Sequence, residues 1–346
     1  MFNPPQKILV LHAGGIGDLL LALPAMRIFR QAFPRYTLEL MGRPERLSVV
    51  TFDLQAESIH SIDQAGMAYF YSDGGTLPPR LSALFSSFSC VLVFGKDSGS
   101  ILANNLSRAG VDRVITIPSF PPPESGIHVS EYLVESLRAA GIEGQSSFSP
   151  LRLPEEALIF ARRFWAGFGL KEEERVLAIH PGSGSPGKNW DARKFAAVAD
   201  WASERCQVLL ISGPAQDGVE EVRTSLKKAR PLGADNLPLI HLAAVLKETT
   251  AYLGNDSGIT HLAALLGLPT VALFGPTNPA LWGPKGPGVR IIYGKNLYTP
   301  SSPEVRSEGS RPCVESIRTD QVVEVLSPFL DNSPASNLSG PLRVEE

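Results

Sequence analysis

The chain has 346 residues, enough for two domains, and its apolar fraction of 43% is that of a globular protein with a sizeable core. A formal net charge of −3 offers no basic surface for a nucleic-acid partner. The three cysteines, at 90, 206 and 313, share no close spacing, which argues against a zinc site or disulfide framework.

The apolar residues near the N-terminus are interrupted by glycines and an aspartate, so they lack the continuous apolar core of a signal peptide. No run of residues approaches the length needed to span a bilayer. We therefore expect a cytoplasmic protein, and a peripheral contact at the inner face of the cytoplasmic membrane stays open.

The first half alternates apolar strand-like runs with helical patterns. Strands are predicted at 7–11, 36–42, 90–95 and 113–118, and helices at 17–33, 98–110 and 128–141. The Gly-, Tyr- and Ser-rich stretch 64–80 is predicted to be a loop over a cleft.

The second half repeats this alternation after a Pro-containing polar stretch at 145–156, which marks a domain boundary. Strand-like runs occur at 175–182, 206–213, 238–243, 251–256 and 270–277, and helices are predicted at 191–204 and 319–330. The pattern favours two α/β domains, 1–150 and 151–330, with parallel sheets and a cleft between them. The last helix could pack back across the junction, and 331–346 is predicted to be a disordered tail.

Polar residues follow two of the predicted neighbouring strands. Asn255, Asp256, Ser257 and Gly258 lie where a strand passes into a helix, which is a favourable place to hold phosphate or sugar hydroxyls. The second loop, GPTNP, begins with Gly275, Pro276 and Thr277. The alternative is a pair of capped loops without a ligand, because Asp and Ser are ordinary helix caps.

The turn after the first strand contains Gly14, Gly15, Gly17 and Asp18. It lacks the G-x-G-x-x-G dinucleotide fingerprint, and an acid inside the turn would repel a pyrophosphate. Asp18 is therefore better suited to proton abstraction or hydroxyl binding. Alternatively, it is an ordinary first-turn acid of the following helix.

The segment 180–195 places Ser183, Ser185 and Lys188 in a Gly/Ser/Pro loop before a helix, where they could face an anion. The spacing is not that of a Walker A loop, and a solvated lysine is the alternative. His261 could reach the 255–258 loop or be a packed helical residue. No carboxylate pair or cluster has metal-ligand spacing, so we expect neither a metal nor a cofactor.

Three segments together resemble the signatures of glycosyltransferase family 9, the heptosyltransferases of lipopolysaccharide core assembly and their relatives. They are GGIGDLLLALPA (14–25), HPGSGSPGKNW (180–190) and GNDSGITHLAALLGLPTVALFGPTNP (254–279). The resemblance extends from Lys7 to about Leu330 and includes RPCVESI (311–317).

The resemblance implies a GT-B fold with two Rossmann-like domains facing a central cleft, the N-terminal one for the acceptor and the C-terminal one for the nucleotide-sugar. It implies an inverting, metal-independent transfer from a donor that is usually ADP-heptose to a lipopolysaccharide core or another surface glycan. Asp18 would be the general base, in an acceptor-side loop with Gly14, Gly15 and Gly17. The donor would be held by residues of the C-terminal half, namely Ser183, Ser185, Lys188, Asp256, Ser257, Gly258, His261, Gly275, Pro276 and Thr277. Ser257 stands where the family commonly has threonine, and the hydroxyl is kept.

Other classes remain open at this point. A nucleotide-sugar epimerase of similar architecture would turn over donor without an acceptor. A non-catalytic nucleotide-sugar-binding protein would be expected to lack Asp18 or Lys188, and both are present. An NAD-dependent oxidoreductase is disfavoured by the missing glycine fingerprint.

Overall fold

The computed structural model describes residues 6–95, 100–122, 125–170, 174–213, 218–294 and 313–331. The predicted tail lies outside these residues apart from Asp331. The chain divides into two compact units, made mainly of residues 1–160 and 161–346. Two short segments of the second half, Pro238–Ala244 and Ala280–Gly283, group with the first unit.

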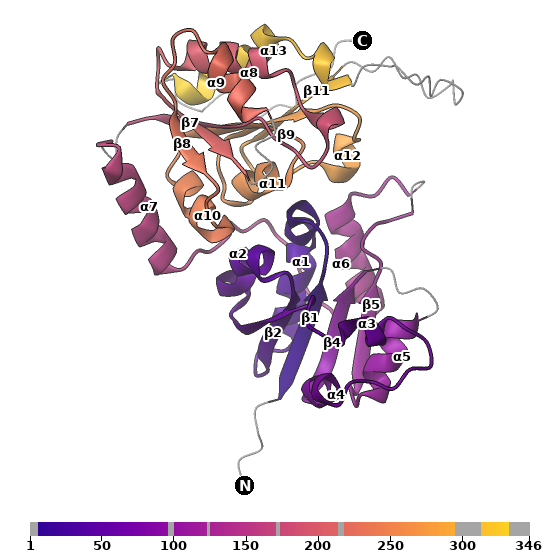
Figure 1. The fold of residues 1–346 in the computed structure, drawn as a ribbon. Helices are drawn as coiled ribbons and strands as arrows, with labels where there is room; N and C mark the ends of the chain where they lie inside the picture. The colour runs from indigo at the N-terminus through magenta and orange to yellow at the C-terminus, as the bar shows by residue number, and fades with distance from the viewer. Residues whose placement is uncertain are drawn as a thin grey trace. The chain divides into compact units, whose positions relative to one another are not determined.

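The described residues of the first unit form a parallel sheet of five strands in the order β3-β2-β1-β4-β5 (Figure 1). The strands are β1 (Lys7–His12), β2 (Thr37–Gly42), β3 (Ala56–Ser61), β4 (Phe88–Phe94) and β5 (Arg113–Ile117). The helices are α1 (Ile16–Ala32), α2 (Pro44–Leu54), α3 (Met67–Phe70), α4 (Pro79–Phe85), α5 (Ile101–Arg108) and α6 (Val129–Ala139). Helix α7 (Glu155–Gly167) carries the chain into the second unit.

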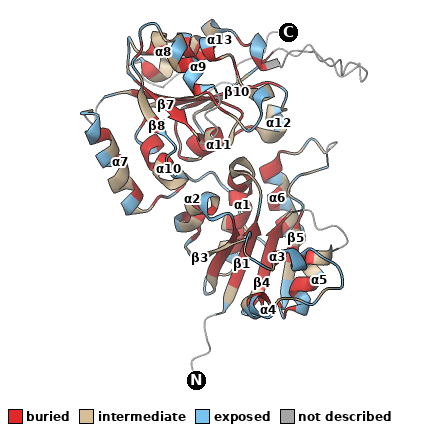
Figure 2. Ribbon diagram, in the orientation of Figure 1, coloured by how far each residue is buried: buried red, intermediate tan, exposed pale blue. Residues whose placement is uncertain are grey.

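Helices cover this sheet because its strands are apolar on both faces, and Figure 2 shows β1 and β4 as largely buried. Leu9 and Val91 pack into one cluster with Phe70, Phe85 and Leu106 from α3, α4 and α5. Helices α1, α2 and α6 pack together, with α1 in contact with the other two. Continuous apolar strands of this kind are typical of a parallel sheet enclosed by helices.

The described residues of the second unit form a parallel sheet of six strands in the order β11-β10-β9-β6-β7-β8. The strands are β6 (Val176–His180), β7 (Gln207–Ser212), β8 (Leu232–Asp235), β9 (Ala251–Asn255), β10 (Thr270–Phe274) and β11 (Val289–Tyr293). The helical elements in this half of the chain are η2 (Pro186–Lys188), α8 (Ala192–Ala202), α9 (Val219–Ser225), α10 (Leu239–Lys247), α11 (Gly258–Leu265), α12 (Pro279–Trp282), η3 (Cys313–Ser316) and α13 (Thr319–Leu330). Most of α10 and of α12 groups with the first unit, and the other elements belong to the second. The terminal helix α13 belongs to this unit and packs on α8.

One predicted strand is wrong. The run 238–243 begins helix α10, which continues to Lys247. A short apolar run does not distinguish strand from helix by itself, and here Pro238 precedes a stretch rich in leucine and alanine, both good helix formers.

The predicted loop at 64–80 is also partly helical. It contains α3 and the start of α4. The side-chain amide of Asn105 donates to the carbonyls of Phe70 at 3.0 Å and Ser72 at 2.9 Å, so a distant helix holds this segment. Nothing in the local composition of 64–80 indicates that support.

Candidate functional site

The principal polar site of the second unit lies where the strand order reverses. β6 pairs with β7 on one side and with β9 on the other, and His180 at the end of β6 is in register with Gly254 of β9. The loops that follow β6 and β9 therefore begin side by side at the carboxyl edge of the sheet. Ligands of open α/β sheets bind at this reversal point.

Asn255 joins the two loops. Its side chain is fully buried, its Nδ2 donates to the carbonyl of Pro181 at 2.6 Å, and its Oδ1 accepts from the amide of Trp190 at 3.1 Å. One amide thus holds both ends of the loop that contains Lys188. Trp190 is anchored further by its indole N–H, which donates to the carbonyl of Ile317 at 3.0 Å.

Lys188 and Asp256 form an ion pair across these loops. The Nζ of Lys188 lies 2.7 Å from Oδ2 of Asp256, and the exposed fractions of the two side chains are 32% and 8%. The structure therefore brings together two residues that are 68 positions apart in the chain. Because an ammonium group has three donors, Lys188 can keep Asp256 as a partner and still contact an anion.

Ser257 is the N-cap of α11. Its Oγ accepts from the amide of Thr260 at 3.4 Å and lies 3.4 Å from Nδ1 of His180. Burial lowers the pKa of His180 to about 4, although part of the residue remains accessible, so its imidazole is neutral near pH 7. A neutral ring and a serine hydroxyl can each act as donor or acceptor toward a ligand.

Three of the other predicted donor residues have structural roles. The Ser183 hydroxyl donates to the carbonyl of Ser185 at 2.7 Å and accepts from its amide at 3.2 Å, which shapes the loop before Lys188. His261 is buried within α11. Gly275 has a packing role, because a Cβ there would lie 2.7 Å from the backbone nitrogen of Val314. Pro276 is exposed and Thr277 half-buried in the turn after β10.

Asp18 and the glycines belong to the first unit, at the carboxyl end of β1. Gly15 is the N-cap of α1, and its amide donates to Oδ2 of Asp18 at 2.9 Å. Asp18 is therefore a first-turn acid with a capping bond, as one of the two sequence interpretations expected. The bond leaves the carboxylate half-buried and fixes one of its oxygens.

Sequence reasoning missed two neighbours of Asp18. A Cβ on Gly14 would lie 3.0 Å from Cε1 of His12 and 3.1 Å from Oδ2 of Asp18, so any side chain there would crowd both groups. Arg46 donates to the carbonyl of Gly14 at 2.8 Å. Burial lowers the pKa of His12 to about 4, against the opposing attraction of the Asp18 charge. A histidine inside an apolar strand carries no local signal of these contacts.

Among the described residues, no group of three or more His, Cys, Asp or Glu side chains is arranged to hold a metal ion. No helix in the same part of the chain is both long and apolar enough to cross a membrane.

Two parallel sheets with strand reversal points, each followed by polar loops, define an α/β protein of the GT-B class. A solved structure of this class, described as Escherichia coli ADP-heptose lipopolysaccharide heptosyltransferase II, superposes with a TM-score of 0.72 at 18% identity, covering 94% of this chain and 98% of that one.

The sequence comparisons agree with this class. The model of glycosyltransferase family 9 (heptosyltransferase) matches residues 126–311. Lipooligosaccharide heptosyltransferase 2 of Haemophilus influenzae is 28% identical over 323 residues, 84% of this chain and 90% of that protein. Lipopolysaccharide heptosyltransferase 3 of E. coli K12 is 23% identical over 278 residues, 76% and 80% of the two chains.

The chain belongs to glycosyltransferase family 9. The predicted family, the GT-B fold with two parallel sheets and the assignment as a glycosyltransferase enzyme are thereby confirmed.

The buried His12 makes stability depend on pH. Between pH 6.5 and about 4 the unfolded chain binds a proton that the folded chain excludes, so stability is complete above pH 6.5 and falls toward pH 4. The free energy of unfolding of the first unit should fall by roughly 3 kcal/mol over this pH range. Hydrogen exchange of the β1 amides in wild type and His12→Leu should show it, and the variant should lack this component. Parallel pH profiles for the two proteins would contradict the prediction.

Proposed function

We propose that this glycosyltransferase moves a heptose from an ADP-heptose donor to a lipopolysaccharide core or related surface-glycan acceptor, with inversion at the anomeric carbon and without a metal ion. The observation that carries the proposal is the Lys188–Asp256 pair at the strand reversal of the second unit, next to the N-terminus of α11. The names of the H. influenzae and E. coli relatives support the choice of heptose.

The second unit is suited to the donor. Lys188 supplies a positive charge, and the N-terminus of α11 adds the positive end of a helix dipole, which together stabilise a departing diphosphate. Asp256 is suited to accept hydrogen bonds from sugar hydroxyls. Its pairing with Lys188 reduces its repulsion of the phosphates, so the acid and the diphosphate can share one site.

The first unit supplies the base. Asp18 Oδ2 is occupied by the Gly15 amide, and Oδ1 has no hydrogen-bond partner among the described residues. The capping bond therefore orients a carboxylate whose second oxygen is available to take the acceptor hydroxyl proton. We propose inversion because one base that deprotonates the acceptor hydroxyl is what a direct, single displacement of the diphosphate requires.

The proposed setting is the inner face of the cytoplasmic membrane. The donor is a cytoplasmic nucleotide-sugar and the acceptor a glycolipid, so the protein would meet its acceptor through a peripheral contact. Neither nucleic acid nor a cofactor takes part in the proposed reaction.

The direct test is a transfer assay in EDTA with ADP-heptose, a panel of other nucleotide-sugars, and a core acceptor that lacks heptose. We expect transfer from ADP-heptose only when acceptor is present, and a product whose anomeric configuration, read by NMR, is inverted. Epimerised donor without acceptor would indicate an epimerase. Activity lost in EDTA and restored by Mg²⁺ would contradict the metal-independent mechanism.

Asp18→Asn should retain the fold, because the amide oxygen can still accept from Gly15. It should retain donor affinity and lower transfer by about 10²–10⁴-fold, the usual contribution of a general base. Glu45→Gln is the matched control, since Glu45 is the exposed first-turn acid of α2. Near-normal turnover by Asp18→Asn would remove Asp18 as the base.

Lys188→Ala should weaken ADP binding by about 10–150-fold, because a charged hydrogen bond contributes about 1.5–3 kcal/mol. The turnover loss should be larger, since charge builds on the leaving group in the transition state. Calorimetry measures the affinity, with exposed Lys247→Ala as control. The double variant Lys188→Ala, Asp256→Asn should recover the part of the loss caused by the unpaired carboxylate. Unchanged affinity in folded Lys188→Ala would exclude a role for the lysine in donor binding.

A further inference from the structure

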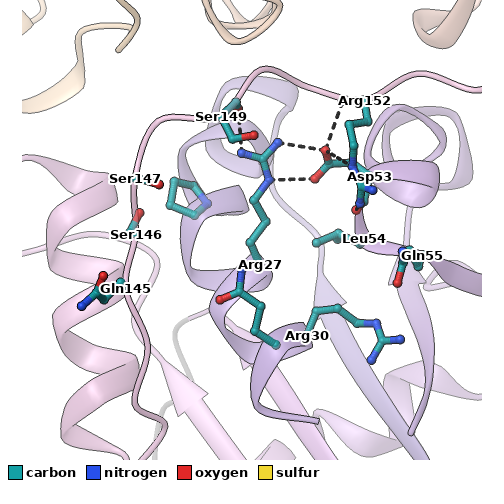
Figure 3. A pocket seen from close by; sticks show the side chains of 12 residues that line it. Arg27, Arg30, Asp53, Leu54, Gln55, Gln145, Ser146, Ser147, Ser149 and Arg152 are labelled. Atoms are coloured by element: carbon teal, nitrogen blue, oxygen red, sulfur yellow. Dashed lines mark hydrogen bonds and ion pairs between the residues drawn. The ribbon is translucent and has the colours of Figure 1, made fainter. Parts of the chain in front are cut away.

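A polar pocket of about 290 Å³ lies in the first unit, against α1, the end of α2 and the segment 145–152 (Figure 3). Pro24 and Leu54 are its only apolar lining residues within the described part of the chain. The remaining lining residues are arginines, glutamines, serines and one aspartate. Arg27 lies nine positions beyond Asp18 on α1, about 13 Å along the helix axis, so this pocket is separate from the proposed base.

One ion pair builds the wall of the pocket. Arg27 binds Asp53 with two bonds, from Nε at 2.7 Å and Nη2 at 2.9 Å, and its Nη1 donates to the carbonyl of Ser149 at 2.8 Å. Asp53 is buried, and its Oδ1 also accepts from the amide of Arg152 at 3.1 Å. In Figure 3 these bonds hold the 145–152 segment over α1. Arg27 and Asp53 therefore serve the fold.

The two other arginines of the lining, Arg152 and Arg30, can still donate hydrogen bonds to a ligand. The guanidinium of Arg152 contacts Asp53, which Arg27 already neutralises, and 54% of its side chain is exposed. Arg30 donates from Nη1 to the carbonyl of Phe33 at 2.7 Å and has no carboxylate partner among the described residues. Three arginines against one aspartate leave the lining with a net charge of +2.

Gln55 adds a side-chain amide to the lining, and its backbone has an unusual conformation. It is the C-cap of α2 with φ of 54°, in the left-handed region where glycine is the usual residue. Its side chain is exposed and lines the pocket. The chain thus keeps a hydrogen-bonding side chain where glycine would be less strained.

We propose that this pocket binds a phosphate-bearing small molecule of about the size of a sugar phosphate. Arginine forks match phosphate oxygens, and the surrounding amides and hydroxyls match sugar hydroxyls. The volume is at the lower end of small-molecule sites, which start at about 300 Å³, so a nucleotide-sugar is too large. Only two of the lining residues are apolar, which favours a polar ligand over an acyl chain.

The test titrates glucose 6-phosphate into the full-length Lys188→Ala protein, in which the proposed donor site is weakened. Calorimetry measures affinity, and hydrogen exchange locates the site. We expect saturable binding that weakens with added salt, protection of α1 and 145–152, and no binding of glucose. Arg30→Gln and Arg152→Gln should each lower the affinity by about 10–150-fold.

Gln55→Gly keeps the test informative if an arginine variant unfolds, since glycine suits the left-handed conformation. It should lower the affinity by about 2–10-fold without lowering thermal stability. Three results would overturn the proposal: no saturable binding, affinity unchanged in all three variants, or arginine-dependent binding of phosphatidylglycerol vesicles without any binding of glucose 6-phosphate.

Discussion

The polar site of the second unit depends on the hydrogen bonds of one side-chain amide, that of Asn255. It satisfies the carbonyl of Pro181 and the amide of Trp190 at the same time, so the two ends of the lysine loop are fixed to the end of β9. The next residue, Asp256, then meets Lys188. Without the amide, two buried backbone groups would lose their partners, at about 1–3 kcal/mol each. The ion pair is thus a consequence of backbone geometry that one uncharged residue sets.

The charged side chains of the two units have different kinds of partner. In the second, a lysine and an aspartate partly cancel each other, and the positive end of α11 remains nearby. In the first, Asp18 is held by a backbone amide, and a neutral histidine and the Arg46–Gly14 contact surround the turn. Glycine at 14 suits this turn because a Cβ there would crowd His12 and Asp18.

The sequence predicts the central strands and the loops that follow them well, because these runs are apolar and end in polar residues. Among the edge strands of the two described sheets it predicts β5 but misses the other three. β3 is half-exposed, β8 has four residues including a glycine, and β11 alternates weakly. The candidate site is predicted as a set of loops, but not as a set of contacts. The pairing of Lys188 with Asp256 depends on the order β6-β9, which local spacing does not contain.

The two sheets also share the same topology around their first strands. In each, the first strand in the chain lies inside the sheet, the second and third extend to one side, and the fourth and fifth to the other, where the second sheet adds β11 as a sixth strand. The turns after β1 and β6 are therefore topological equivalents. One carries an acid on a helix cap and the other a lysine in a Ser/Gly loop. The same strand order thus places an acid in the turn after β1 and a lysine in the turn after β6, so side chains of opposite charge occupy equivalent positions in the two sheets.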